Sequence, residues 1–242
     1  MRAALIDHLG VMFREIREDK RMAESMRCAG LSMLHKGKGR SPKLPKSYRP
    51  IAVTNSAYRI LMKAIQLKLA PATTAVVGKT QMAYLTDGRR IWDNTLLLAG
   101  VARQMEKEGK GGAAVQVDNT AAFDRVRWDF LQEVMEAMGF PEEFREFIGE
   151  IYTDLQFAIR VNGQKGGKGN VTNGVRQGCP ASPLIFIIVQ EALLMAIRGD
   201  AQLKGIKVVT GEGGKETEVR ERCMADDTVV YLESAEQAER LF

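Results

Sequence analysis

Apolar residues recur every three or four positions over several stretches of the 242-residue chain, as in helices that bury one face. The pattern predicts mainly helix within residues 1–34, with a short apolar segment at 30–34. It also predicts helices over 56–69, 90–106, 128–138, 144–155 and 182–199. The last of these begins with Ser182 and Pro183 and ends at Gly199, residues that favour helix starts and a helix end respectively.

Shorter apolar runs predict strands. Residues 113–117 form a buried-strand candidate that ends at Asp118, and 219–224 with 228–232 predict a hairpin around an Ala-Asp-Asp turn. Two further strands, 157–161 and the segment from 171 onward, flank a glycine-rich stretch that matches no phosphate-binding motif, so we expect a flexible hairpin tip there. Helices and strands mix without regular alternation, which favours an α+β fold.

Composition narrows the class of protein. Hydrophobic residues make up 45% and charged residues 27%, which is ordinary globular usage and excludes wholesale disorder, collagen and coiled coil. The apolar run 183–197 is too short to span a bilayer and contains Gln190 and Glu191, so no membrane partner is expected. The chain has three cysteines without paired spacing, which argues against a disulfide framework or a zinc site. We expect an intracellular protein.

The net charge of +5 favours polyanionic partners only weakly. Its distribution is more informative, because residues 36–49 carry six cations and no acid. Prolines in this segment predict a loop or an extended hairpin. A basic run of this kind is usually a solvated surface, and it indicates a function only if a site that acts on phosphates lies nearby.

Two predicted strand ends carry aspartates. Asp118 follows the strand at 113–117, and Asp226 with Asp227 occupies the predicted hairpin turn. Taken alone, a two-acid turn is simply exposed. If the strand ending at Asp118 lies beside the hairpin, three carboxylates converge, and such oxygen ligands suit Mg²⁺. Two ions about 4 Å apart would activate an attacking hydroxyl and stabilise the leaving oxygen of a phosphoryl displacement.

Five sequence blocks occur in the order of a known family. They are Tyr48-Arg49-Pro50-Ile51 with Tyr58-Arg59-Ile60-Leu61, Gln81-Met82-Ala83-Tyr84 with residues 88–94, residues 118–126, residues 176–184, and Met224-Ala225-Asp226-Asp227. From about residue 24 to the end, the chain resembles the reverse transcriptase domain of non-long-terminal-repeat (LINE-type) retrotransposons. Met224 replaces the usual aromatic residue, Ala181 is smaller than usual, and one extra residue precedes Gly88. None of these departures removes a metal ligand.

The resemblance implies a right-hand polymerase fold with fingers and palm, in which a mixed or antiparallel palm sheet packs on helices. It assigns residues 1–35 to a helical lead-in, 36–112 to the fingers and 113–242 to the palm with some finger elements. The family's thumb is expected to be absent from this segment.

The same resemblance implies the site residues. Asp118, Asp226 and Asp227 would be catalytic, and with the carbonyl of Asn119 they would hold two Mg²⁺ ions, for which Mn²⁺ can substitute. The residues implied for the incoming nucleotide are Arg49, Lys38, Phe123, Gln177 and Gly178, with Phe123 as the gate that excludes a ribose 2′-hydroxyl. Arg89 and Arg176 are assigned to template or primer, although pairing of Arg89 with backbone is equally compatible. Asp124 is interpreted as structural, capping or pairing with Arg125 or Arg127.

The implied activity is RNA-directed DNA synthesis, in which a primer 3′-hydroxyl attacks the α-phosphate of a deoxynucleoside triphosphate (dNTP). Its partners would be an RNA template, a DNA primer and dNTPs, in the nucleus or cytoplasm by family analogy, and the oligomeric state is not indicated. Two alternatives stay open. One is a reverse transcriptase of group II intron type. The other is a decayed or truncated fragment that binds nucleic acid without catalysis, since no thumb would hold the duplex.

Overall fold

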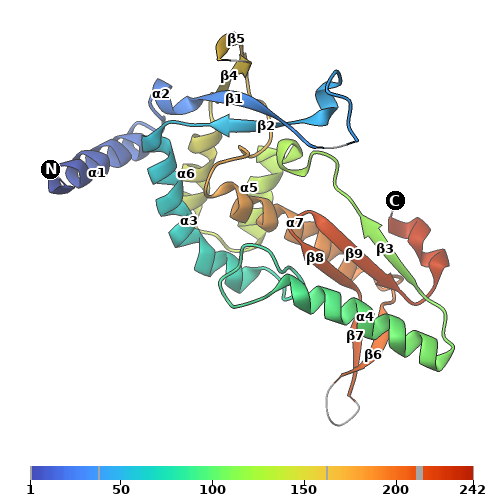
Figure 1. Cartoon of the computed structure of the whole chain (residues 1–242). Helices are drawn as coiled ribbons and strands as arrows, with labels where there is room; N and C mark the ends of the chain where they lie inside the picture. The colour runs from blue at the N-terminus through green and yellow to red at the C-terminus, as the bar shows by residue number, and fades with distance from the viewer. Residues whose placement is uncertain (1, 38, 162, 211–214, 242) are drawn as a thin grey trace. The chain divides into compact units, whose positions relative to one another are not determined.

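The chain folds into two compact units that are each built from two separate stretches of sequence. The computed structural model describes residues 2–37, 39–161, 163–210 and 215–241 (Figure 1). One unit comprises Met1–Leu69 with Phe123–Ile185, and the other comprises Ala70–Ala122 with Phe186–Phe242. The expected boundaries of lead-in, fingers and palm, after residues 35 and 112, stay a prediction.

The first unit contains a mixed four-stranded sheet in the order β2-β1-β4-β5. Its strands are β1 (Cys28–His35), β2 (Tyr48–Val53), β4 (Gln156–Val161) and β5 (Gln164–Asn170). β1 runs antiparallel to β2 and parallel to β4, and β4 runs antiparallel to β5. The basic segment therefore connects an antiparallel pair, as an extended hairpin does. Pro50 is accommodated because β2 is an edge strand.

Two sequence predictions for this unit are wrong. β1 occupies Cys28–His35, where mainly helix was expected, because pairing with β2 on one side and β4 on the other stabilises extended backbone. β5 covers the glycine-rich stretch expected to be a hairpin tip, and the described residues after Asn170 do not continue it. Gly169 lies opposite Phe157, where an added Cβ would come within 2.5 Å of the Phe157 ring. Glycine has a low strand propensity, but at position 169 it is the residue that leaves room for the Phe157 ring on the neighbouring strand.

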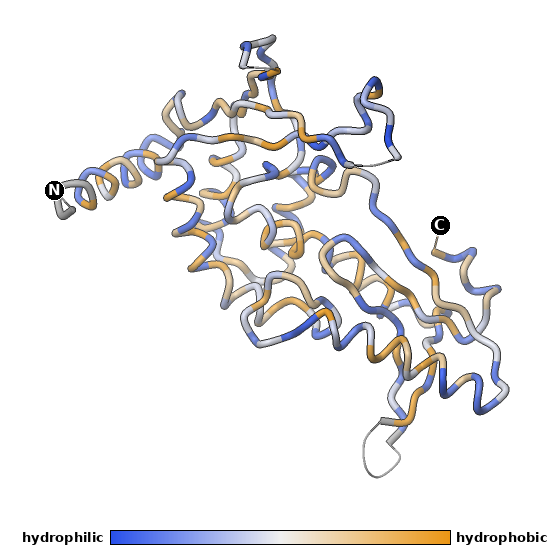
Figure 2. The backbone as a smooth tube through the Cα atoms, viewed as in Figure 1, coloured by the Kyte–Doolittle hydropathy of each residue, from blue (hydrophilic) through white to orange (hydrophobic). Residues whose placement is uncertain are grey.

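Helices complete the first unit. They are α1 (Arg2–Glu18), α2 (Glu24–Arg27), the 3-10 turns η1 (Pro45–Ser47) and η2 (Ala122–Arg125), the start of α3 (Ser56–Val76), α5 (Trp128–Ala137) and α6 (Glu142–Tyr152). Hydrophobic and hydrophilic residues alternate along α1, as expected of a surface helix (Figure 2). Asn55 caps α3, its Oδ1 accepting a 2.8 Å hydrogen bond from the Tyr58 amide. α3 runs beyond its expected end at residue 69 and contains Pro71.

The second unit is built on an antiparallel sheet in the order β3-β9-β8, with a separate β6–β7 hairpin. Its strands are β3 (Ala113–Val117), β6 (Ile206–Thr210), β7 (Lys215–Val219), β8 (Glu221–Met224) and β9 (Asp227–Leu232), and its helices are α4 (Ile91–Glu108), most of α7 (Ser182–Gly199) and η3 (Ala235–Leu241). Tyr231 packs with Val101 of α4 and with the β6–β7 hairpin. Val230 and Leu232 pack with Ile197 of α7. Alternate residues of β9 therefore bury both faces of the sheet.

α7 has 18 residues and is longer than the apolar run expected from the sequence. By length and composition alone it could cross a membrane, and 56% of it is buried within the fold. Gln190 and Glu191 are buried with it, at 5% and 1% exposure, and each has a polar partner. These are the features of a core helix.

Candidate active site

The position of Asp118 is set by the pairing of β3 with β9. Val117 pairs with Thr228, so Asp118 comes one residue beyond that pair, with its side chain exposed. The neighbouring Asn119 donates through Nδ2 to Oε1 of Gln190 over 3.2 Å. Gln190 in turn donates through Nε2 to Oγ1 of Thr228 over 3.1 Å. This polar chain fixes the end of β3 against α7 and β9.

Asp226 lies in the tight turn of the β8–β9 hairpin. Met224 pairs with Asp227, so the turn consists of Ala225 and Asp226. Ala225 has a φ of +58°, the left-handed conformation that two-residue hairpin turns require. Asp226 is partly buried and Asp227 is exposed. The hypothesis that the strand ending at Asp118 lies beside this hairpin is confirmed by the β3–β9 pairing (Figure 1).

The carboxylates of Asp118, Asp226 and Asp227 lie at one end of the sheet. None of the ion pairs found among the described residues includes Asp118, Asp226 or Asp227. That part of the chain also holds no group of three acidic, histidine or cysteine side chains gathered for a metal ion. The described residues therefore do not show the convergence of three carboxylates that the sequence predicts, although Asp118, Asp226 and Asp227 lie at the same end of the sheet. Oxygen donors of this kind fit Mg²⁺, and their roles as ligands stay a prediction.

The side chain of Gln81 forms hydrogen bonds with the backbone of the turn at Ala225. This role was not predicted from the sequence. The Gln81 Oε1 accepts hydrogen bonds of 2.9 Å from the amides of both Ala225 and Ala83. Its Nε2 donates over 3.2 Å to the Ala225 carbonyl and to Sγ of Cys223. The side chain is completely buried. In the sequence, Gln81 is marked only as the first residue of the block Gln81-Met82-Ala83-Tyr84, and this position does not indicate which residues it contacts.

Arg89 fastens the segment that carries Gln81. Its Nη1 donates to the carbonyls of Gly78 and Gln81 over 2.5 and 3.1 Å, and its Nε pairs with Asp87 over 2.7 Å. Of the two roles weighed for Arg89, pairing with backbone is the one that these contacts describe. Its assignment to the template stays a prediction.

In the first unit, Gln177 is held by Asp124. The Gln177 Nε2 donates to both carboxylate oxygens of Asp124, over 3.1 and 3.2 Å. A carboxylate only accepts hydrogen bonds, so this contact fixes which end of the amide faces it. Burial raises the pKa of Asp124, while the Gln177 hydrogen bond and the charge of Lys36 lower it. The expected pairing with Arg125 or Arg127 is wrong, because no ion pair found among the described residues includes Asp124, and Arg127 pairs with Asp129.

Backbone hydrogen bonds fasten the loop before Gln177 to the turn that carries Phe123. The Val175 amide donates to the Phe123 carbonyl over 2.7 Å. The Ala52 amide of β2 donates to the Gln177 carbonyl over 2.8 Å. Gly178 has a φ of +104°, and an added Cβ would stand 2.9 Å from the Ala52 carbonyl oxygen. Glycine at position 178 therefore lets this loop approach the backbone of β2 closely.

Arg176 is committed to the interior of its unit. Only 6% of it is exposed, and its guanidinium donates to the carbonyls of Met26 and Arg27. The guanidinium carbon also lies 4.9 Å from the centre of the Tyr58 ring, a cation–π contact. These contacts give Arg176 a structural role, and its assignment to template or primer stays a prediction.

The remaining nucleotide-site candidates are less constrained. Arg49 is exposed on the edge strand β2, opposite Leu34. Phe123 is partly buried in η2. Lys38 lies outside the described residues. The roles of these three side chains stay predictions.

Comparison with known proteins adds independent information. Residues 35–242 match the family model of the reverse transcriptase (RNA-dependent DNA polymerase). A transposon TX1 uncharacterized 149 kDa protein from Xenopus laevis is 30% identical over 218 residues, which are 89% of this chain and 16% of that protein. The retrovirus-related Pol polyprotein of the type-2 retrotransposable element R2DM from Drosophila melanogaster is 24% identical over 195 residues, which are 79% of this chain and 17% of that protein.

A solved structure shares the fold. Apo telomerase from Candida tropicalis, truncated from the C-terminal domain, superimposes with a TM-score of 0.54 over 98% of this chain and 50% of that one, at 10% identity. This likeness confirms the expected α+β fold of the fingers and palm. Because the family model matches most of the chain, and the five sequence blocks fall within that match, the chain belongs to the reverse transcriptase (RNA-dependent DNA polymerase) family, among those of non-long-terminal-repeat retrotransposons.

Proposed function

We propose that this chain catalyses RNA-directed DNA synthesis, with a primer 3′-hydroxyl attacking the α-phosphate of a dNTP. The observation that carries the proposal is the position of Asp118 and Asp226 at one end of the β3-β9-β8 sheet, without cationic partners among the described residues. The chain spans 16–17% of the length of two of the relatives it matches, so the activity and partners of the whole protein belong to this proposal.

The carboxylates of Asp118 and Asp226 would hold two divalent ions, with the Asn119 carbonyl as a further ligand and Asp227 in support. Bound Mg²⁺, or Mn²⁺ in its place, would activate the attacking hydroxyl and stabilise the leaving pyrophosphate. The protein's own contribution is to place these oxygens. Gln81 fixes the Ala225–Asp226 turn, and the Asn119–Gln190 contact fixes the end of β3.

In the first unit, we assign nucleotide binding to residues of β2, η2 and the loop after β5. Arg49, with Lys38, would contact the triphosphate through charge-assisted hydrogen bonds. Gln177 and Gly178 would lie under the nucleotide and the template base. The Phe123 ring would exclude a ribose 2′-hydroxyl and so select dNTPs. The hydrogen bonds that hold Gln177 to Asp124, and Val175 to Phe123, support a preorganised pocket.

Primer extension on an RNA template tests the activity. We expect Asp226→Asn to abolish Mg²⁺-dependent extension, because the amide removes a negative oxygen ligand. Asp7→Asn, an exposed aspartate on α1, is the matched control and should leave extension unchanged.

A second measurement separates loss of metal from loss of fold. Mn²⁺ binding followed by electron paramagnetic resonance should weaken in Asp118→Asn and Asp226→Asn, while circular dichroism stays unchanged. Undiminished extension in Asp226→Asn would refute the proposal. Salt-sensitive RNA binding without any extension in the unmodified chain would favour the non-catalytic alternative.

A further inference from the structure

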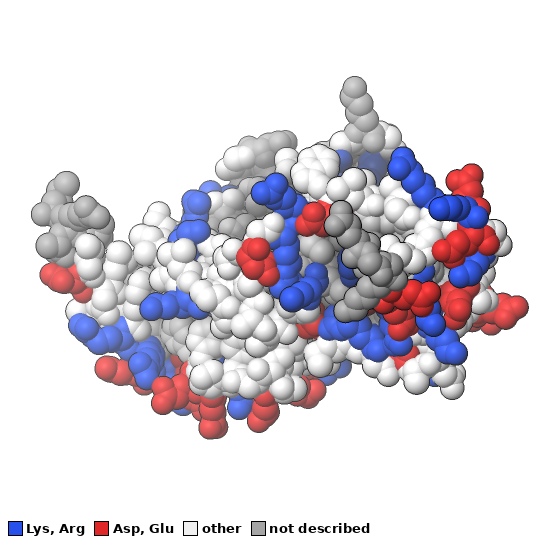
Figure 3. Space-filling view, turned by 90° about the horizontal axis from the view of Figure 1, so that it is seen from below, with Lys and Arg blue, Asp and Glu red and all other residues white. Residues whose placement is uncertain are grey.

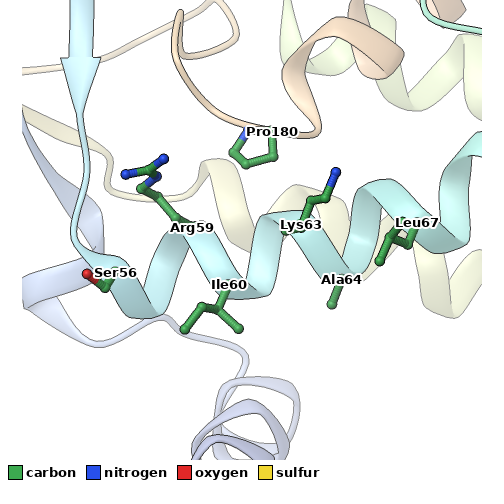
Figure 4. Close-up of a pocket in the computed structure, with 7 residues that line it drawn as sticks. All are labelled: Ser56, Arg59, Ile60, Lys63, Ala64, Leu67 and Pro180. Carbon is green, nitrogen blue, oxygen red and sulfur yellow. The ribbon is translucent and has the colours of Figure 1, made fainter.

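A groove runs along the exposed face of α3, in the first unit. Its volume is about 560 Å³, and it is lined by Ser56, Arg59, Ile60, Lys63, Ala64, Leu67 and Pro180. Figure 4 shows Arg59 and Lys63 extending from α3 on the side where Pro180 lies. Pro180 belongs to the loop that carries Gln177, three residues earlier in the chain. The groove thus borders a segment to which nucleotide binding is assigned.

The sequence of α3 makes this face basic. Residues on the opposite side, including Leu61, Met62 and Ile65, are buried, which leaves Arg59 and Lys63 exposed. Lys68 is also exposed, and α3 contains no acidic residue. Four residues of helix span about 6 Å, so Arg59 and Lys63 form a continuous basic edge.

These cations have no acidic partner among the described residues. Neither Arg59 nor Lys68 takes part in any of the ion pairs found there, and the hydrogen bond of Lys63 is to the neutral Oε1 of Gln66, over 2.6 Å. Elsewhere in the unit, Arg17 and Lys20 are matched by Glu143 and Glu146.

The basic segment 36–49 also carries exposed cations, but none of its residues lines this groove. Arg176, which was assigned to template or primer, is buried against backbone carbonyls. On the face of the molecule shown in Figure 3, basic and acidic side chains are interspersed. The exposed face of α3 presents Arg59 and Lys63 one helical turn apart, and α3 contains no acidic residue.

We propose that this face of α3 binds the sugar–phosphate backbone of single-stranded RNA, as the template strand of the proposed reaction. Arg59 and Lys63 match the negative charge of successive phosphates. Ile60 and Leu67 supply apolar surface against the sugars. No aromatic residue lines the groove, so the bases lack a stacking platform and binding is independent of sequence. The inference rests on the proposed function, because that function supplies the RNA.

Two other negatively charged partners could bind this basic face, an anionic membrane and an acidic helix of another protein, and the experiment below distinguishes them from RNA. An anionic membrane needs a broad apolar face beneath the basic residues, whereas this face offers only Ile60, Ala64 and Leu67. An acidic helix of a protein partner would need that same apolar row as its main contact. The proximity of Pro180 to the Gln177 loop favours RNA over both.

Fluorescence anisotropy with labelled single-stranded RNA, in the absence of divalent ions, tests the proposal on the full chain. We expect Arg59→Gln/Lys63→Gln to weaken binding on the order of tenfold and to reduce the slope of log K against log salt by about 1.4, which is 0.7 per phosphate contact. Arg17→Gln/Lys20→Gln is the matched control, since it removes the same charge from the same unit, and it should change neither value.

Several outcomes would overturn the inference. An equal loss in both double variants would show that net charge alone matters. A strong preference among RNA sequences would indicate base readout. Loss of binding to anionic lipid vesicles or to a glutamate-rich helical peptide, with RNA binding unchanged, would assign the face to that partner.

The failure of this inference is distinguishable from failure of the proposed function. Asp226→Asn should bind RNA as the unmodified chain does while losing primer extension. If Asp226→Asn abolishes extension and Arg59→Gln/Lys63→Gln leaves RNA binding intact, the polymerase assignment stands and the α3 surface is refuted.

Discussion

At the scale of single residues, Gln81 stabilises the turn that carries Asp226, because its side chain forms hydrogen bonds with both the amide and the carbonyl of Ala225. Gln81→Met keeps a similar shape and removes these bonds. The amides of Ala225 and Ala83 would lose their partner, and leaving buried amides unpaired costs about 1–3 kcal/mol, so we expect the free energy of unfolding in urea to fall by that amount.

Matched variants make this expectation specific. Gln116→Met changes an exposed glutamine of β3 and should leave the free energy of unfolding nearly unchanged. Gln81→Glu keeps an acceptor for the Ala225 amide and loses the donor to the carbonyl, so it should not behave like the native residue. A loss in Gln81→Met no larger than in Gln116→Met would mean that the turn holds itself.

Asp124 gives a pH dependence with a definite sign. Burial raises its pKa above the ordinary value of 3.8, although Gln177 and Lys36 oppose the shift. The folded state therefore binds this proton more tightly than the unfolded state does. The stabilising contribution is fully present below 3.8 and is lost as the pH rises through the folded pKa.

Urea denaturation across a pH series checks this contribution. Relative to the native chain, Asp124→Asn should gain stability as the pH rises from about 4, because Asn has no charge to desolvate. The Asn Oδ1 can still accept one hydrogen bond from Gln177. A difference between the two proteins that does not change with pH would show that Asp124 does not titrate in this range.

At the level of residues, the sequence predicted the positions of Asp118 and Asp226 at strand ends, but it did not predict most side-chain contacts. Asp118 and Asp226 could be found because each follows or interrupts an apolar strand pattern. The partner of Asp124 could not, since Gln177 is 53 positions away. The burial of Arg176 could not be predicted either, because its hydrogen-bond partners are backbone carbonyls, which every residue has.

Among the elements, β5 shows where a local pattern fails. Glycine has low strand propensity, so the stretch reads as a turn, yet it pairs with β4. The β8–β9 hairpin was predictable because its apolar strands and tight turn are local features. β1 was not, because its two neighbours come from residues 48–53 and 156–161.

Two glycines of β5 give a matched pair of variants. Gly169→Ala would place a Cβ 2.5 Å from the Phe157 ring, so the ring must move, and we expect a loss of about 1–3 kcal/mol in the free energy of unfolding. Gly167→Ala meets nothing within 4 Å. It should stay within about 0.5 kcal/mol of the native value. Equal effects in the two variants would indicate that the ring yields without cost.

For the whole molecule, the two discontinuous units raise the question of where stability resides. In the second unit, Arg198 contacts two nearly inaccessible acids, Glu191 and Glu221, and also bonds Oγ1 of Thr80 over 3.1 Å. No local sequence pattern predicts this network, since its members are separated along the chain and its value depends on burial. We expect it to be the main polar support of the second unit.

Replacing Arg198 by Met would leave both carboxylates buried without a partner, which costs about 3–5 kcal/mol. Arg17→Met, which breaks an exposed pair with Glu143, should cost about 0–1 kcal/mol. Hydrogen exchange locates the effect, because amides of β3, β8 and β9 should lose protection in Arg198→Met while those of β1 and β4 keep it. Equal loss of protection in both sheets would show that the two units unfold together, and then this network supports the entire fold.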